Sequence, residues 1–260
     1  MKNKRKVIGS VQRAIDILNL FNKDTPELGT TQIARSMKLP KSTAAGLIYT
    51  LEQNGFLDQN PNTRKYRLGF KLAERTGILL FHFDLRQIAI PVLQQLRDQC
   101  KESVNLGVRD GNDIVYIERM HGHSMLGMRP EIGKRERIHS TALGKAIVST
   151  LSKKEMDQFI ENYNFFPITP KTITDRGLFL IELQKSKECG YALDDQENEI
   201  GGRCVASPIL DLGGVTVGAL SISVPLLRMP DSLIEPLGNQ VLHAAQEISS
   251  QIGASLEEQT

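Results

Sequence analysis

The chain has 260 residues, of which 40% are hydrophobic and 24% are charged, an ordinary composition for a globular protein of two domains. Its apolar runs are too short to cross a bilayer, and no apolar segment follows the basic start Met1–Lys6. We therefore expect neither a membrane span nor a signal peptide. The three cysteines, Cys100, Cys189 and Cys204, lack metal-ligand spacing, which favours reduced thiols in a cytoplasmic protein without a metal site or a cofactor.

The net charge of +2 hides an uneven distribution along the chain. Residues 1–75 contain 14 Lys and Arg against 6 Asp and Glu, whereas the remainder contains 18 against 24. A basic first part on an acidic body indicates phosphate binding through the first part only. Charge asymmetry between domains is also common without such a role, so this observation carries modest weight by itself.

Short amphipathic helices are expected first in the chain. One covers residues 10–21 and is followed by a loop over residues 22–29. Two more, over residues 31–37 and 41–54, flank the turn Lys38–Pro40, because proline ends one helix and can begin the next. This pattern predicts a helix-turn-helix.

The helix predicted over residues 41–54 has two unlike faces. Apolar residues recur with helical spacing at Ala44, Leu47, Ile48 and Leu51, which predicts one buried stripe. The opposite face is small and polar. A helix with such a face can enter the major groove of DNA.

Two short strands, Phe56–Gln59 and Arg64–Leu68, are expected to form a hairpin around the turn Asn60–Thr63. A hairpin packed behind a helix-turn-helix is a wing, and wing cations usually contact phosphates. Taking the helix face and the wing together, we predict that these residues contact double-stranded DNA: Lys41, Ser42, Thr43, Ala45, Tyr49, Arg64, Lys65 and Arg67.

Residues 69–83 are expected to form a linker helix with more apolar side chains than a solvated connector needs. These are Leu72, Ile78, Leu79, Leu80 and Phe81. Exposed apolar surfaces of this size usually mark an interface. We therefore expect a homodimer through residues 1–85, doubled into a dimer of dimers through the rest of the chain.

The pattern then becomes mixed. After an amphipathic helix over residues 84–101, strands are expected at 104–108, 114–118, 126–128, 204–210 and 215–224, with helices at 140–149, 153–162, 176–189 and 230–256. Antiparallel hairpins with helices grouped around them predict an α+β fold for this part of the chain.

Six segments together match a known family. They are Ser10–Ala14, Leu39–Thr43, Thr50–Leu57, His139–Ala146, Gly190–Ala206 and Gly218–Ser223. The chain resembles the IclR family of bacterial transcription regulators from about Val7 to Ser250. Helix-turn-helix patterns occur in many unrelated proteins, but the last three segments in this order behind a winged helix are far more specific.

The resemblance implies a DNA-binding regulator of a catabolic operon, expected here to be a repressor that binds a near-palindromic site. It implies a winged helix-turn-helix over residues 1–70, a linker helix over 71–87 and a GAF-like α+β effector domain over 88–260. The family often has large polar residues early in the recognition helix, where this chain has Ala45 and Gly46. That departure shifts sequence reading toward Lys41, Ser42, Thr43 and Tyr49.

The resemblance also implies a small carboxylated metabolite as effector. The matching positions are Met128, Ala142, Leu143, Asp194, Cys204, Ser221 and Ser223. The residue types suit this role, because Ser221 and Ser223 are two apart on a strand and face the same side. The helix start near Ala142 and Leu143 favours an anion. Read without the family, alternating serines usually face solvent and a lone aspartate before a turn usually caps it.

Two other classes of function are alternatives. His121 or His123 with Cys204 or Asp194 would make a metal or nucleophile site in an enzyme, but nothing in the spacing supports this, and no G-x-S-x-G, C-x-x-C or phosphate loop is present. A metabolite-binding protein with a basic N-terminal interaction module, free of DNA, is the other alternative. The basic wing weighs against it.

Overall fold

The structure is a computed structural model that describes residues 7–81, 84–122 and 131–257. The chain divides into two units, residues 1–82 and 83–260, which are described one at a time. The strand expected at 126–128 and the candidate effector residue Met128 lie outside the described residues. Within those residues, no helix combines the length and the apolar character that crossing a membrane would need.

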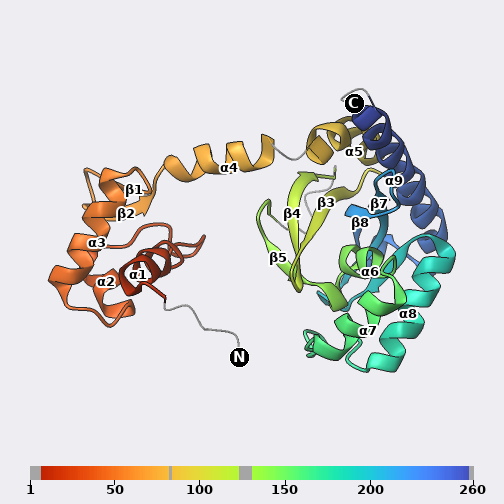
Figure 1. The fold of residues 1–260 in the computed structure, drawn as a ribbon, viewed down its shortest axis with the longest axis horizontal. Coiled ribbons are helices and arrows are strands. Elements are labelled where there is room, and N and C mark those ends of the chain that lie inside the picture. The colour runs from red at the N-terminus through yellow and green to blue at the C-terminus, as the bar shows by residue number, and fades with distance from the viewer. Residues whose placement is uncertain (1–6, 82–83, 123–130, 258–260) are drawn as a thin grey trace. The chain divides into compact units, whose positions relative to one another are not determined.

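The first unit has the expected order of elements (Figure 1). These are α1 (Gly9–Leu18), α2 (Thr30–Ser36), α3 (Lys41–Gln53), β1 (Leu57–Gln59), β2 (Tyr66–Leu68) and α4 (Lys71–Phe81). Its core joins α1, α2, α3 and β1 through Ile17, Ile33, Ala44, Ile48 and Leu57, each no more than 2% exposed. The buried stripe predicted for the third helix is therefore confirmed.

The wing differs from expectation at one end. We expected its second strand to begin at Arg64, but β2 begins at Tyr66. Arg64 has a φ of 57°, a left-handed conformation that a strand does not accommodate. The Asn60 side chain accepts hydrogen bonds from the backbone of Asn62 and Thr63, which extends the turn and shortens the strand.

The second unit is an antiparallel sheet with helices on both faces. Its strands are β3 (Ser103–Asp110), β4 (Asp113–Met120), β5 (Arg135–Arg137), β6 (Ala192–Asp195), β7 (Gly202–Leu210) and β8 (Thr216–Pro225), in the order β5-β4-β3-β8-β7-β6. The short edge strands β5 and β6 were not expected from the sequence. Their few residues lack the alternation that identifies longer strands. The predicted α+β class is confirmed.

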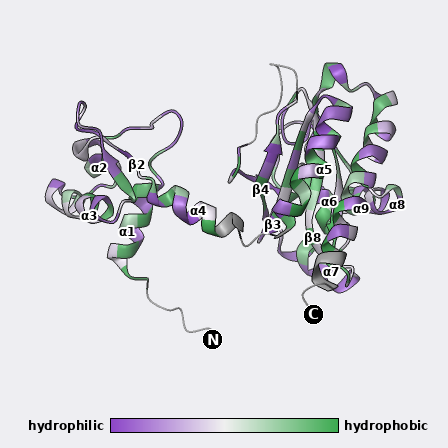
Figure 2. Ribbon diagram, turned by 90° about the horizontal axis from the view of Figure 1, so that it is seen from above, coloured by the Kyte–Doolittle hydropathy of each residue, from purple (hydrophilic) through white to green (hydrophobic). Residues whose placement is uncertain are grey.

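The helices of this unit divide between the two faces. Helices α5 (Asp84–Cys100) and α9 (Ile234–Glu257) pack together on one face, and α6 (Ala142–Val148) covers the other with α7 (Lys153–Asn162) and α8 (Arg176–Cys189) beyond it (Figure 1). In Figure 2 hydrophobic and hydrophilic residues alternate along α5 and α9, as expected of helices packed by one side.

Two helix starts differ from the prediction for local reasons. The helix expected over residues 140–149 begins at Ala142, because Thr141 is extended and caps it, after a 3-10 turn η1 (Ile138–Ser140). The helix expected over residues 230–256 begins with a 3-10 turn, η3 (Asp231–Leu233), and becomes α-helical at Ile234. Its early proline, Pro236, lies in the first turn of α9, where proline is tolerated.

Candidate DNA-binding surface and ligand site

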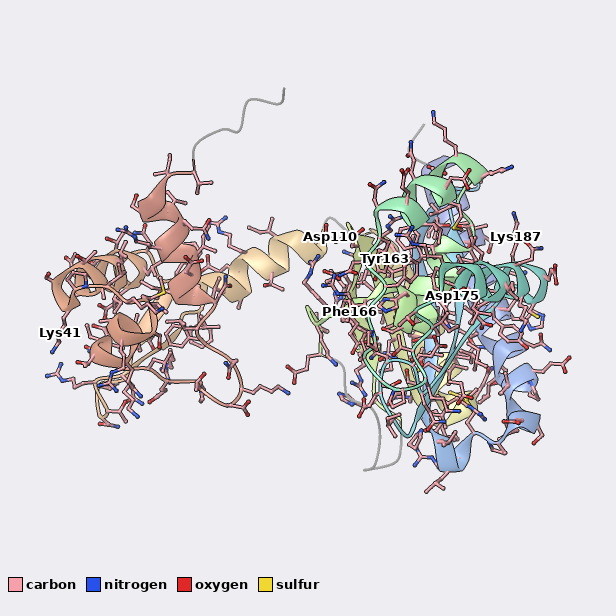
Figure 3. The ribbon with its side chains drawn as sticks, turned by 90° about the horizontal axis from the view of Figure 1, so that it is seen from below. Lys41, Asp110, Tyr163, Phe166, Asp175 and Lys187 are labelled. Carbon is pink, nitrogen blue, oxygen red and sulfur yellow. The ribbon has the colours of Figure 1, made fainter. Side chains whose placement is uncertain are left out.

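The predicted DNA-contacting residues of α3 all lie on its exposed face. Lys41, Ser42, Thr43, Ala45 and Tyr49 are exposed, while the stripe behind them packs into the core of the unit. Lys41 projects away from the body of its unit (Figure 3). The helix therefore presents small and polar side chains of the kind that fit a major groove.

In the middle of this face the side chains are small, so the backbone of α3 is little covered there. A Cβ placed on Gly46 would meet nothing within 4 Å, so no neighbouring side chain fills the space above it. The hydroxyl of Thr50, one turn later, donates to the Gly46 carbonyl at 2.9 Å and is engaged with its own helix. A binding partner can therefore approach the backbone of α3 closely between Thr43 and Tyr49.

The wing cations are not equivalent. The guanidinium of Arg67 donates to Asp58 through Nη2 at 2.6 Å and Nε at 2.9 Å, so a carboxylate on the facing strand offsets its charge. Within the described residues, Arg64 and Lys65 have no such ion pair, and both are exposed. Glu27 fixes the tip by accepting from the side chains of Asn60 and Thr63 at 2.7 and 3.0 Å.

The second unit carries buried polar side chains on one face of its sheet. We call them the polar row: Ser103, Asn105, Arg119, Asp194, Cys204, Ser221 and Ser223, all no more than 8% exposed. Strand register places them together. Asn105 lies opposite both Arg119 and Ser221, while Ser223 lies opposite both Ser103 and Cys204, and Cys204 opposite Asp194. Residues directly opposite on paired strands have side chains on the same face.

The polar row lies on the α6 side of the sheet. Cys204 and its strand neighbours Ala206 and Ala219 belong to the same apolar cluster as Ala142 and Leu143 of α6. Four of the predicted effector residues, Asp194, Cys204, Ser221 and Ser223, are thus brought together. Sequence reasoning missed Ser103, Asn105 and Arg119, although the alternation of Ser103 and Asn105 with apolar Val104 and Leu106 carried the signal.

Hydrogen bonds within the polar row orient the two serines. Asn105 Nδ2 donates to Ser221 Oγ at 3.2 Å and to Ser223 Oγ at 3.0 Å, and Cys204 Sγ contacts Ser223 Oγ at 3.2 Å. Each serine oxygen therefore accepts. Among the described residues neither hydroxyl donates to another group, so two adjacent O–H donors remain on one face of the sheet. Paired donors of this kind suit a carboxylate.

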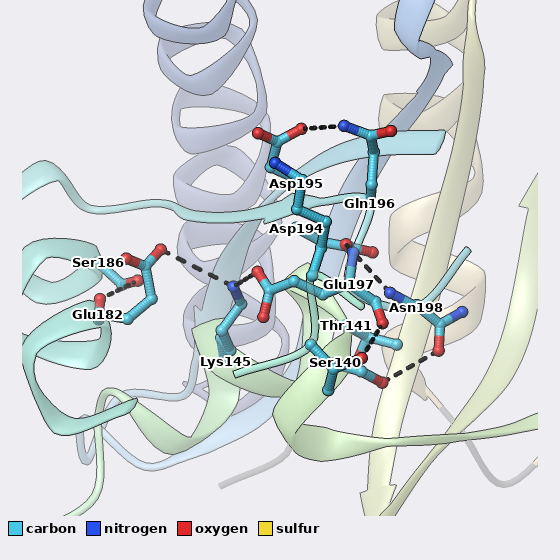
Figure 4. Close-up of polar contacts among 12 residues, drawn as sticks. Ser140, Thr141, Lys145, Glu182, Ser186, Asp194, Asp195, Gln196, Glu197 and Asn198 are labelled. Carbon is cyan, nitrogen blue, oxygen red and sulfur yellow. Dashed lines mark hydrogen bonds and ion pairs between the residues drawn. The ribbon is translucent and has the colours of Figure 1, made fainter. Parts of the chain in front are cut away.

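Asp194 caps a turn. Its Oδ1 accepts from the backbone N–H of Glu197 at 2.8 Å and of Asn198 at 3.4 Å (Figure 4). Burial raises the pKa of Asp194 from 3.8 to about 7, against the opposing effect of the Lys145 charge. This is the ordinary structural role of a lone aspartate before a turn, and it places a carboxyl with a pKa of about 7 opposite Cys204.

A buried ion pair holds this turn to α6. Lys145 is fully buried, and its Nζ lies 2.5 Å from Glu197 Oε1 and 3.8 Å from Glu182 Oε1 of α8 (Figure 4). Burial raises the pKa of Glu197, while the Lys145 charge opposes that rise. The turn that carries Asp194 is therefore fixed against the helix that covers the polar row.

The backbone at the start of α6 is already engaged in contacts within the protein, more than the predicted anion site would suggest. The Thr141 hydroxyl accepts from the Gly144 N–H at 3.1 Å, so this donor is already used within the protein. A Cβ on Gly144 would lie 2.2 Å from the Ile138 carbonyl oxygen, so the helix start packs directly on the η1 backbone. Ala142 and Leu143 are each 2% exposed and belong to the apolar cluster that packs beside the polar row.

The histidines lend no support to a catalytic site. His139 is buried, with Nδ1 3.0 Å from the Tyr163 hydroxyl and Nε2 2.9 Å from the Phe166 carbonyl oxygen, and burial lowers its pKa. Tyr163 and Phe166 lie close together near α7 in Figure 3. His121 is exposed, and His123 lies outside the described residues. Within the parts that the structure describes, no three His, Cys, Asp or Glu residues are grouped to hold a metal ion.

A winged helix with an exposed, small and polar helix face, together with a separate α+β unit that carries a buried polar row, defines a DNA-binding regulator with a ligand domain. The IclR helix-turn-helix domain matches residues 10–61, and the domain described as bacterial transcriptional regulator IclR C-terminal matches residues 78–250. The chain belongs to the IclR family of bacterial transcription regulators.

Individual relatives agree over nearly the whole chain. The HTH-type transcriptional regulator XynR of Escherichia coli K12 is 38% identical, over 95% of this chain and 98% of its own length. The HTH-type transcriptional repressor AllR of the same organism is 29% identical, over 94% and 90%. The crystal structure of Thermotoga maritima IclR superposes with a TM-score of 0.83 at 31% identity, covering 94% and 99%. These relatives are regulators of transcription, not enzymes.

The titration of Asp194 predicts a pH dependence of stability. The folded state holds its proton more tightly than the unfolded chain does, so the stabilising contribution is complete below pH 3.8 and is lost as the pH rises to about 7. Asp194→Asn should remove this loss, so its free energy of unfolding should decline less than that of the parent across this range. Urea unfolding followed by circular dichroism at several pH values measures it.

The neighbouring Asp195 provides a control of opposite sign. Hydrogen bonds from Arg203 lower the pKa of Asp195, so its contribution is present above pH 3.8 and is lost as the pH falls through the lowered pKa. Asp195→Asn should therefore leave the decline between pH 3.8 and 7 in place. Parent and Asp194→Asn curves that run parallel would contradict the assignment.

Proposed function

We propose that this chain represses transcription of a catabolic operon in the cytoplasm, by binding a near-palindromic DNA site as an oligomer, and that a small organic acid bound at the polar row alters that binding. The observation that carries the effector proposal is the pair of adjacent O–H donors of Ser221 and Ser223, both buried and both fixed by Asn105. Repression is also the activity named for the relative AllR.

A carboxylate suits the polar row better than a neutral ligand does. The two hydroxyl donors lie on one face of the sheet, and the guanidinium of Arg119 lies on the same face, where its Nη2 donates to Ser103 Oγ at 3.4 Å. Donors and a cation in a water-poor setting favour an anion. Cys204, Ala142 and Leu143 supply the apolar wall, and Asp194 would accept from an uncharged part of the ligand while it is ionised.

The DNA proposal divides the labour between α3 and the wing. Lys41, Ser42, Thr43, Ala45 and Tyr49 would face base edges and the adjacent backbone. Arg64 and Lys65 would face phosphates, with a smaller role for Arg67 because Asp58 already offsets its charge. This division assigns sequence preference to the helix and salt dependence to the wing.

The assembly proposal rests on apolar side chains left uncovered in the first unit. Val7, Ile8, Val11 and Ile15 of the α1 region are between 47% and 69% exposed, and Ile78 of α4 is 50% exposed. Val11 and Ile15 lie one turn apart on one side of α1, next to the face that packs in the core, and Val7 and Ile8 precede the helix. A homodimer through the first unit would cover them, and a dimer of dimers would use the second unit as well.

For DNA binding, Thr43→Ala or Tyr49→Ala should relax sequence preference, since each good base contact contributes about 1–3 kcal/mol of discrimination. Arg64→Ala should weaken binding to all sequences and reduce the salt slope by about one. Fluorescence anisotropy with operator and scrambled duplexes at several salt concentrations measures both. Lys153→Ala, an exposed cation of α7, is the control and should change neither. An unchanged salt slope in Arg64→Ala would contradict the division of roles.

For effector binding, Ser221→Ala should weaken binding of the acid about tenfold or more, because it removes a hydrogen bond to a charged group worth about 1.5–3 kcal/mol. DNA affinity without effector should stay near that of the parent. Asp194→Ala should change which acids are accepted. Ser207→Ala is the matched control, since this buried serine of β7 donates to the Gly190 carbonyl outside the polar row. Calorimetry against short hydroxy and keto acids gives the comparison, and equal affinities in parent and Ser221→Ala would move the site elsewhere.

For assembly, light scattering at micromolar concentration should give the mass of a dimer or a tetramer. Val11→Asp places a charge among the uncovered α1 side chains and should shift the protein toward smaller species, whereas Leu212→Asp, at an exposed turn of the second unit, should not. A parent that remains a monomer both with and without DNA would exclude the proposed oligomer.

A further inference from the structure

The side-chain amide of Asn105 has a hydrogen-bonded nitrogen, Nδ2, and an oxygen, Oδ1, without a hydrogen-bond partner. Its side chain is fully buried on β3, at the centre of the polar row. Both hydrogen bonds of Nδ2 go to β8, to the hydroxyls of Ser221 and Ser223. Its Oδ1 accepts no hydrogen bond from any described residue. The amide is thus held in one orientation with a bare acceptor on its other side.

A buried acceptor without a donor is unusual and unfavourable. Nearly all buried polar atoms in folded proteins are paired, because an unpaired one loses its hydration without compensation. In the row, the Ser221 and Ser223 oxygens accept from Nδ2 and Arg119 Nη2 donates to Ser103 Oγ, while Arg119 Nε, a buried donor on the same face, makes no hydrogen bond to Oδ1. No described donor bonds Oδ1, so a molecule that enters the row can supply one.

We infer that Asn105 is a specificity-determining residue that selects an effector with a hydroxyl group close to its carboxylate, that is, a 2- or 3-hydroxy acid. This inference rests on the proposed function of the polar row as an acid-binding site. The carboxylate takes the two serine hydroxyl donors, and the ligand hydroxyl donates to Asn105 Oδ1. Because one amide touches both serines and also carries the acceptor, the two ligand groups are only a few bonds apart.

This arrangement distinguishes ligands by the direction of one hydrogen bond. A 2-hydroxy acid donates to Oδ1. The corresponding 2-oxo acid offers only a carbonyl oxygen, which repels Oδ1, and the deoxy acid leaves Oδ1 unpaired. A site built to bond a hydroxyl rejects an analogue that lacks it, because the polar group of the site is then left buried without a partner. The reversed amide would present N–H donors to the ligand and would favour the oxo acid.

Calorimetry with the full-length protein and two matched sets of acids tests the inference. The first set is lactate (both enantiomers), pyruvate and propionate, and the second set is 3-hydroxybutyrate (both enantiomers), acetoacetate and butyrate, so within each set only the hydroxy acid carries a hydroxyl. In each set the parent should bind the hydroxy acid at least about tenfold more tightly than the other two, a difference of about 1.4 kcal/mol. Asn105→Leu, of similar volume, should reduce that preference to about twofold or less. Ser207→Ala should keep it.

The outcomes separate this inference from the proposed function. If the parent binds an oxo or deoxy acid as tightly as the hydroxy acid, or if Asn105→Leu keeps the preference, the role of Asn105 is overturned while the acid site stands. If none of the acids binds the parent at millimolar concentration, both are overturned. The order measured on the parent decides the question even if Asn105→Leu fails to fold.

Discussion

The second unit depends on one buried ion pair, Lys145–Glu197. Lys145 lies at 0% exposure within α6, so its charge is stable there only because Glu197 faces it at 2.5 Å and Glu182 lies at 3.8 Å. Removing one partner of such a pair leaves a buried charge uncompensated, which typically costs about 3–5 kcal/mol. The pair connects the helix that covers the polar row to the turn that presents Asp194. The Thr172 hydroxyl also donates to the Glu197 carbonyl at 2.7 Å and the Thr169 hydroxyl to the Gln196 carbonyl at 2.7 Å, so the turn is held from two sides.

Near this ion pair, two glycines, Gly107 and Gly144, allow α6 to pack closely on the sheet beside the polar row. The first turn of α6 meets the η1 backbone so closely at Gly144 that no side chain fits there. A Cβ on Gly107 would lie 3.0 Å from Leu143 and 2.8 Å from Ile114, so any side chain at that point of β3 would force these two side chains to move. Close packing of α6 on the sheet brings the apolar wall against polar side chains that alternate with core residues on the same strands. The hydroxyls face a dry environment, where hydrogen bonds to an anion are strong.

The first unit, which contains the helix-turn-helix, has a small hydrophobic core. Its helices are short, and its stability comes from a few fully buried residues of α1, α2, α3 and β1. Because so few residues are buried, one face of α3 and the wing stay exposed, together with apolar residues on α1. The Arg67–Asp58 pair reduces the net charge of the wing, so its electrostatic attraction is concentrated at the tip beside Arg64 and Lys65.

The sequence by itself determined the elements whose causes are local. Helical spacing placed the stripe of α3, proline set the turn before it, and a capping aspartate with a C-terminal glycine bounded α8. Local pattern also paired Ser221 with Ser223 on one side of a strand. Only the tertiary structure decided that Asn105 on β3 holds these serines from 116 and 118 residues away, that Lys145 pairs with Glu197 from 52 residues away, and that Arg67 pairs with Asp58. The physical reason is that strand register and helix packing set these distances, and both depend on burying the whole core rather than on any neighbouring residues in the chain.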